Sequence, residues 1–166
     1  GDPVVRTMAA GTLIAMLPGL LAMRRAAAAL VLALAAGAAQ AQFLSVGENA
    51  VILYDAPSRA AKPLYVVSRR YPLEVIVNLE AWVKVRDHSG ALTWVERKAL
   101  VEQRTVVIIA PSAEARVRPE DGAPVAFVAA QNVVLELLGA TAGGWIRVRH
   151  ADGANGYLRS SLVWGA

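Results

Sequence analysis

Few residues in this chain have side chains that could carry out chemistry. The two histidines, His88 and His150, lie in turn-like stretches, and neither has a second metal-ligating residue at a recognisable spacing. There is no cysteine, which removes thiol nucleophiles and thiolate metal sites. The serines lack the glycine context of a nucleophile elbow, and there is no glycine-rich phosphate loop. We therefore expect no catalytic residues, no metal site, no cofactor and no enzymatic activity.

Two similar strand-like segments combine an aromatic residue with cations. The first is Trp82-Val-Lys-Val-Arg86, and the second, 63 residues later, is Trp145-Ile-Arg-Val-Arg149. The period-two alternation of a strand turns the aliphatic residues inward and places three side chains together on the opposite face. In the first segment these are Trp82, Lys84 and Arg86, and in the second they are Trp145, Arg147 and Arg149.

Such a face has two interpretations. A tryptophan beside two cations can bind a peptide or a sugar. Alternatively, each tryptophan closes one end of a small β-structure and the cations are ordinary solvated residues.

The repeat extends well beyond these two segments. Gly90 and Trp94 match Gly153 and Tyr157 at the same spacing. Asp87–Gly90 and His150–Gly153 have the composition of tight hairpin turns, and short apolar runs flank them. Residues 97–100 and 160–163 are each expected to form a single helical turn. Because no sustained helical period occurs, the fold class expected is all-β, with two tandem small barrels at residues 45–103 and 104–166.

The order of these motifs resembles that of bacterial SH3 domains. Residues 51–58, the Trp82 strand and residues 90–95 carry the likeness in the first copy, and residues 115–119, 144–148 and 153–158 carry it in the second. The family often has a second glycine before the last aromatic residue; the second copy has Gly156 there, whereas the first has Thr93. The resemblance therefore implies two tandem SH3-like barrels.

The same resemblance implies an aromatic groove between loops. Tyr54, Tyr65, Tyr71 and Trp82 of the first copy are expected to line it. At roughly corresponding places the second copy has Arg118, Ala126 and Asn132, so the first copy is expected to be the better binder. The family is associated with cell-wall peptides, which makes peptidoglycan the leading ligand. There are two alternatives. The protein could be a periplasmic scaffold that binds another envelope protein, or an accessory subunit of an envelope hydrolase.

The beginning of the chain has the pattern of an export signal. Met23-Arg24-Arg25 precedes an apolar run and a small-residue site at Ala39-Gln40-Ala41, so residues 23–41 are expected to be a signal peptide. An uncleaved anchor is the alternative, although the run is short for a membrane span. Residues 1–22 are expected to be an upstream translation or a leader extension. The mature protein would then be periplasmic or secreted, touching the membrane only through the signal segment before cleavage.

The charge does not indicate a nucleic-acid partner. The chain has 17 basic and 13 acidic residues, of which three and one lie in residues 1–41, so the remainder carries about +2. No run exceeds two adjacent cations, whereas nucleic-acid binding requires a concentrated basic stripe.

Overall fold

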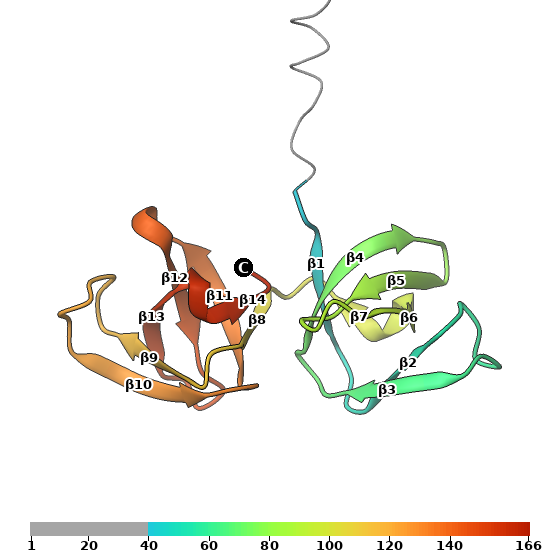
Figure 1. The fold of residues 1–166 in the computed structure, drawn as a ribbon, viewed down its shortest axis with the longest axis horizontal. Helices are drawn as coiled ribbons and strands as arrows, with labels where there is room; N and C mark the ends of the chain where they lie inside the picture. Colours follow the sequence, from blue (N-terminus) through green and yellow to red (C-terminus); the bar gives the residue numbers. More distant parts are fainter. Residues whose placement is uncertain (1–39) are drawn as a thin grey trace, which may run out of the picture. The chain divides into compact units, whose positions relative to one another are not determined.

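The computed structural model describes residues 40–166, which form two seven-stranded antiparallel sheets (Figure 1). The stretches expected to be a leader extension and a signal peptide lie almost wholly outside these residues. No helix among the described residues has the length and apolar character needed to cross a membrane.

The first sheet, barrel one, has the strand order β3-β2-β6-β5-β4-β1-β7. Its strands are β1 (Phe43–Val46), β2 (Val51–Tyr54), β3 (Pro63–Val67), β4 (Pro72–Asn78), β5 (Trp82–Arg86), β6 (Leu92–Glu96) and β7 (Leu100–Val101). A 3₁₀ turn, η1 (Arg97–Ala99), joins β6 to β7, as the sequence predicted.

The second sheet, barrel two, repeats this order seven strands later as β10-β9-β13-β12-β11-β8-β14. Its strands are β8 (Thr105–Ile108), β9 (Ser112–Arg116), β10 (Val125–Ala130), β11 (Val134–Ala140), β12 (Trp145–Arg149), β13 (Asn155–Arg159) and β14 (Val163–Trp164). The 3₁₀ turn η3 (Ser160–Leu162) is the equivalent of η1, and a further turn, η2 (Ala142–Gly144), precedes β12. The all-β prediction with two tandem SH3-like barrels is confirmed.

Each barrel has its own apolar core, built from the inward-facing residues that alternate along its strands. Val83 and Val85 of β5 are fully buried, and Ile146 and Val148 of β12 occupy the same positions in barrel two. The predicted inward face of both strands is therefore confirmed.

The hairpin after each of these strands depends on a glycine. Gly90 and Gly153 have φ angles of +89° and +95°, a conformation that other residues adopt only with strain. In the first turn the Asp87 carboxylate accepts hydrogen bonds from the N–H groups of Ser89 and Ala91, at 2.9 and 3.1 Å. These bonds fix the register of β5 against β6.

Candidate functional site

An aromatic pair lies at one end of barrel one. Trp82 begins β5, and its ring meets the ring of Tyr54, the last residue of β2, edge to face with centroids 5.7 Å apart. Both rings are half-buried. Each belongs to a terminal residue of its strand, next to a residue that points into the core. The apolar face of Trp82 is thus held rigidly while part of it stays in contact with solvent.

Beside this pair are two hollows. The Trp82 hollow is lined by residues 57–59, 80–82 and 96–98 and has a volume of about 590 Å³. The Tyr54 hollow, of about 310 Å³, lies on the outer side of β2, where Ile52 and Tyr54 line it. Pocket sizes of this order suit a small ligand or a peptide segment.

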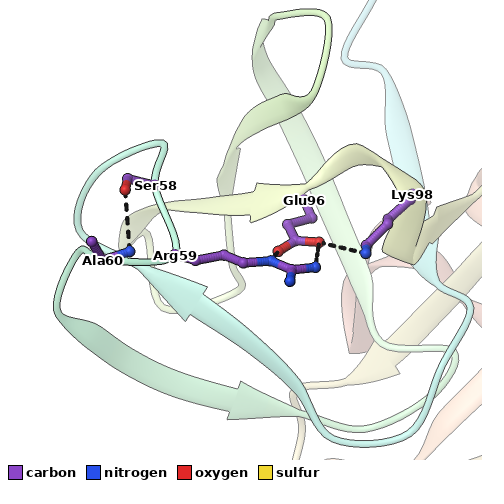
Figure 2. A network of polar contacts seen from close by, with 5 residues as sticks. All are labelled: Ser58, Arg59, Ala60, Glu96 and Lys98. Carbon is purple, nitrogen blue, oxygen red and sulfur yellow. Dashed lines mark hydrogen bonds and ion pairs between the residues drawn. The ribbon is translucent and has the colours of Figure 1, made fainter.

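Arg59, Glu96 and Lys98 line both hollows, and their side chains are joined by ion pairs (Figure 2). Arg59, in the loop between β2 and β3, donates to both carboxylate oxygens of Glu96 at the end of β6, with Nη2 2.9 Å from Oε2. Lys98 Nζ lies 3.3 Å from the same Oε2. The hydrogen bonds from Arg59 lower the pKa of Glu96 from 4.5 to about 2, so this carboxylate is charged at any physiological pH. We call these three residues the ion bridge.

The other two tyrosines expected in the groove lie elsewhere. Tyr65 is on the edge strand β3, with about half of its surface exposed, and it lines neither hollow. Tyr71 packs against the barrel core and hydrogen-bonds to Nδ1 of His88 in the β5–β6 turn. Burial raises the pKa of Tyr71. Of the four residues expected to line one groove, the structure therefore brings Tyr54 and Trp82 together and places Tyr65 and Tyr71 outside both hollows.

The cations of β5 share a face with Trp82, as predicted, but they do not line the Trp82 hollow. Lys84 Nζ lies over the ring of Trp94 on β6, 5.9 Å from its centroid. Arg86 is paired with Glu74 of β4 at 3.1 Å. In this arrangement the two cations belong to the outer surface of the sheet.

In barrel two the matching tryptophan is covered. Trp145 is only 6% exposed, and the guanidinium of Arg159 lies 4.5 Å from its ring centroid. Arg159 in turn donates to Asp121 at 2.7 Å and to the carbonyl of Gly143 at 3.2 Å. The hollow at this place, about 310 Å³, has Arg159 and Asp121 in its wall.

The two remaining cations predicted for barrel two lie on the outer face of β12. Arg147 is exposed and opposite Tyr157, and Arg149 is paired with Glu136 at 3.4 Å. They repeat the Lys84 and Arg86 positions of β5 and lie outside the hollow of barrel two.

The strand register also corrects the assumed correspondence between the copies. Tyr54 pairs with Trp94 and Arg116 pairs with Tyr157, so Arg116 replaces Tyr54, in place of the expected Arg118. Phe127 pairs with Ala115 in the same way that Tyr65 pairs with Leu53. Phe127, and not the expected Ala126, is therefore the counterpart of Tyr65. The carbonyl of Tyr71 accepts a hydrogen bond from the N–H of Val46, and the carbonyl of Val133 accepts the equivalent bond from the N–H of Ile108. Val133, and not the expected Asn132, is therefore the counterpart of Tyr71. Barrel two therefore does have an aromatic residue at one of these positions.

Each of the two histidines has a close side-chain partner. His88 is engaged with Tyr71, and His150 lies 3.1 Å from Asp152 within its own turn. Within residues 40–166, no group of three or more His, Cys, Asp or Glu side chains is placed to hold a metal ion. The described residues thus form an aromatic pair, two hollows beside it and the ion bridge.

Two seven-stranded barrels in tandem, each with a tryptophan at its end, define a pair of small SH3-like binding modules. The family model for the bacterial SH3 domain matches residues 47–102 and 110–165. The chain belongs to the bacterial SH3 domain family.

Other comparisons add less. A search of curated proteins found no match. Among solved structures, the chain is similar to NlpC2 from Trichomonas vaginalis (15% identity, TM-score 0.35, 75% of this chain and 48% of that one). It is also similar to an NlpC/P60 family protein from Bacillus cereus ATCC 10987 (16% identity, TM-score 0.35, 74% and 55%). The chain spans about half the length of these structures, and likeness at this level carries no functional argument.

Proposed function

We propose that this protein is a non-catalytic, exported binding module that recognises cell-wall peptide or peptidoglycan through the Trp82 hollow of barrel one. The observation that carries the proposal is the half-exposed Trp82, braced edge-on by Tyr54 beside a hollow of about 590 Å³. A fixed aromatic ring gives a ligand a large apolar contact at little cost in side-chain entropy. Barrel two is the weaker candidate, since Arg159 covers Trp145.

Co-sedimentation of the full chain with purified cell-wall sacculi tests the proposal. Trp82→Ala should weaken binding about 30-fold, the effect of losing roughly 2 kcal/mol from an aromatic anchor. Trp145→Ala is the matched control and should bind almost normally. Thermal unfolding of both variants separates a binding defect from a folding defect, and Trp82→Phe retains an aromatic face if the alanine variant unfolds. Normal binding by a folded Trp82→Ala variant would place the ligand elsewhere.

The alternative is a protein-docking role, as an envelope scaffold or as an accessory subunit of an envelope hydrolase. The edge strand β3 favours it, because it pairs only with β2 and exposes Leu64, Tyr65 and Val66. Such an edge can accept an extended segment of another protein. Val66→Lys should then abolish capture of an envelope protein in a pull-down and leave sedimentation with sacculi unchanged, whereas Trp82→Ala should do the reverse.

Bacterial SH3 domains are typically extracytoplasmic. We propose a periplasmic or secreted location for this chain, with cleavage after Ala41. Amino-terminal sequencing of the protein recovered from the producing cell should start at Gln42. A mature species that retains Arg24 and Arg25 would instead indicate an anchored protein.

A further inference from the structure

The ion bridge lies where a ligand in the Trp82 hollow would meet charge. Its three members come from separate segments, namely the loop after β2, the end of β6 and the turn η1, and all three line both hollows. A ligand that leaves the Trp82 ring in the direction of the Tyr54 hollow must therefore cross these side chains.

Charge in the bridge is unevenly matched. Two cations share the single carboxylate of Glu96, whose side chain is 19% exposed, while the side chains of Arg59 and Lys98 are each 67% exposed. Arg59 uses two of its five N–H donors on Glu96, and the ammonium of Lys98 has three donors of its own. The exposed side of the bridge is thus an array of charged donors.

The rest of the Trp82 hollow does not reverse this excess. Of the other two charged residues in its wall, Arg97 donates to the carbonyls of Leu79 and Glu80, with Nε 2.9 Å from the Glu80 oxygen. Glu80 contributes one carboxylate. The wall therefore holds three cations and two carboxylates, which favours an anionic ligand group over a cationic one.

We propose, on the basis of the binding function proposed above, that the ligand carries a carboxylate that binds Arg59 and Lys98 while its apolar part lies against Trp82. Cations presenting several N–H donors bind carboxylates through short, charge-assisted hydrogen bonds. Barrel two lacks this subsite. There the donors of Arg159 are engaged with Asp121 and Gly143, and its guanidinium lies on the tryptophan itself.

The test compares native sacculi with sacculi whose free peptide carboxyl groups have been converted to carboxamides. The wild-type full chain should bind the amidated material about tenfold more weakly, the loss expected for one charge-assisted contact. Arg59→Gln and Lys98→Gln should each bind native sacculi about tenfold more weakly than wild type and should no longer distinguish the two preparations. Lys84→Gln removes a cation that lies over Trp94, outside the hollow, and should behave as wild type.

The outcomes separate the two proposals. Equal binding of wild type to native and amidated sacculi, with Trp82→Ala defective on both, overturns the carboxylate subsite and leaves the binding function standing. Weakening by Lys84→Gln equal to that by Lys98→Gln also overturns the subsite, because it shows general attraction by positive charge. If wild type sediments with neither preparation, both proposals are wrong. Cooperative urea unfolding of the two ion-bridge variants, with a stability loss no greater than the roughly 1 kcal/mol expected for one surface ion pair, confirms that they are folded.

Discussion

Each barrel carries one ion pair between the loop after its second strand and the end of its sixth strand, which we call the rim pair, and the two rim pairs have their charges exchanged. In barrel one, the loop after the second strand supplies a cation, Arg59, and the sixth strand supplies an acid, Glu96. In barrel two the equivalent loop supplies an acid, Asp121, and the equivalent strand a cation, Arg159. Both pairs join residues nearly equally far apart, 37 and 38 positions.

This exchange accompanies a difference in the exposure of the two tryptophans, since Trp82 is half-buried and Trp145 is 6% exposed. A carboxylate has no attraction for an aromatic face, so Glu96 leaves part of Trp82 uncovered. At the equivalent position of β13, the guanidinium of Arg159 lies 4.5 Å from the ring centroid of Trp145 and helps to cover that ring. The same fold thus has a partly exposed tryptophan in barrel one and a covered one in barrel two, and the charge on the neighbouring strand is one difference between them.

The cores differ in a complementary way. In barrel one Leu53 and Thr93 are buried and Tyr65 is half-exposed. In barrel two the matching residues are Ala115 and Gly156, and the ring of Phe127 packs into the space they leave. Barrel one thus fills this part of its core with Leu53 and Thr93, and barrel two fills it with Phe127.

The largest effect on stability should come from placing the larger residue of barrel one in the core of barrel two. Gly156→Thr gives barrel two the residue found in barrel one, but a Cβ at this position meets the Cβ of Ala115 at 2.7 Å and Phe127 at 3.2 Å. We expect a loss of about 2 to 3 kcal/mol in the free energy of unfolding of barrel two. Urea unfolding followed by amide hydrogen exchange measures each barrel separately. Gly122→Ala, at an open position, is the control, and an unchanged midpoint for Gly156→Thr would contradict the packing described here.

The second prediction tests where the barrels should agree. Val85 and Val148 are both fully buried at the same position on β5 and β12. Truncating either to alanine should cost its own barrel roughly 1 to 3 kcal/mol, through lost apolar burial and a small cavity. The same measurement applies, and costs that differ strongly between the barrels would show that the two cores do not pack equivalently.

A smaller effect on stability, with a clear effect on exposure, should follow from exchanging the rim charges. Asp121→Arg with Arg159→Glu should uncover Trp145, and Arg59→Asp with Glu96→Arg should cover Trp82. Each exchange should change the free energy of unfolding by less than about 1 kcal/mol, because both pairs are exposed. Acrylamide quenching of tryptophan fluorescence should rise for the first double variant and fall for the second. Unchanged quenching in both would mean that the rim charge does not control access.

The smallest expected effect is a pH dependence of barrel one. Arg59 lowers the pKa of Glu96 to about 2 in the folded state, against 4.5 ordinarily, so the folded state favours the ionised carboxylate. The resulting stabilisation is present above the unfolded pKa and is lost as the pH falls through 4.5 toward 2. Glu96→Gln lacks this contribution. The difference between its unfolding midpoint and that of wild type should therefore shrink on acidification, and a constant difference would argue against the pair.

The sequence alone determined the strands, the turns and the repeat. The alternation in Trp82-Val-Lys-Val-Arg86 fixes which side chains face inward, because successive residues of a strand point to opposite faces. Gly90 and Gly153 mark turns whose positive φ angles exclude most other residues. The 3₁₀ turns at Arg97–Ala99 and Ser160–Leu162 were also predicted, because these features depend on neighbours in the chain.

Only the tertiary structure decided which aromatic residues meet and which are covered. In the folded chain Tyr54 contacts Trp82, whereas Tyr65 and Tyr71 lie outside the hollows beside this pair. In barrel two, Arg159 lies over the ring of Trp145. The ion bridge was not foreseen either, and its one sequence signal was the opposite charge of Arg59 and Glu96 at positions that barrel two repeats in reverse. These contacts join residues far apart in the chain, and local residue patterns do not encode which of those residues meet.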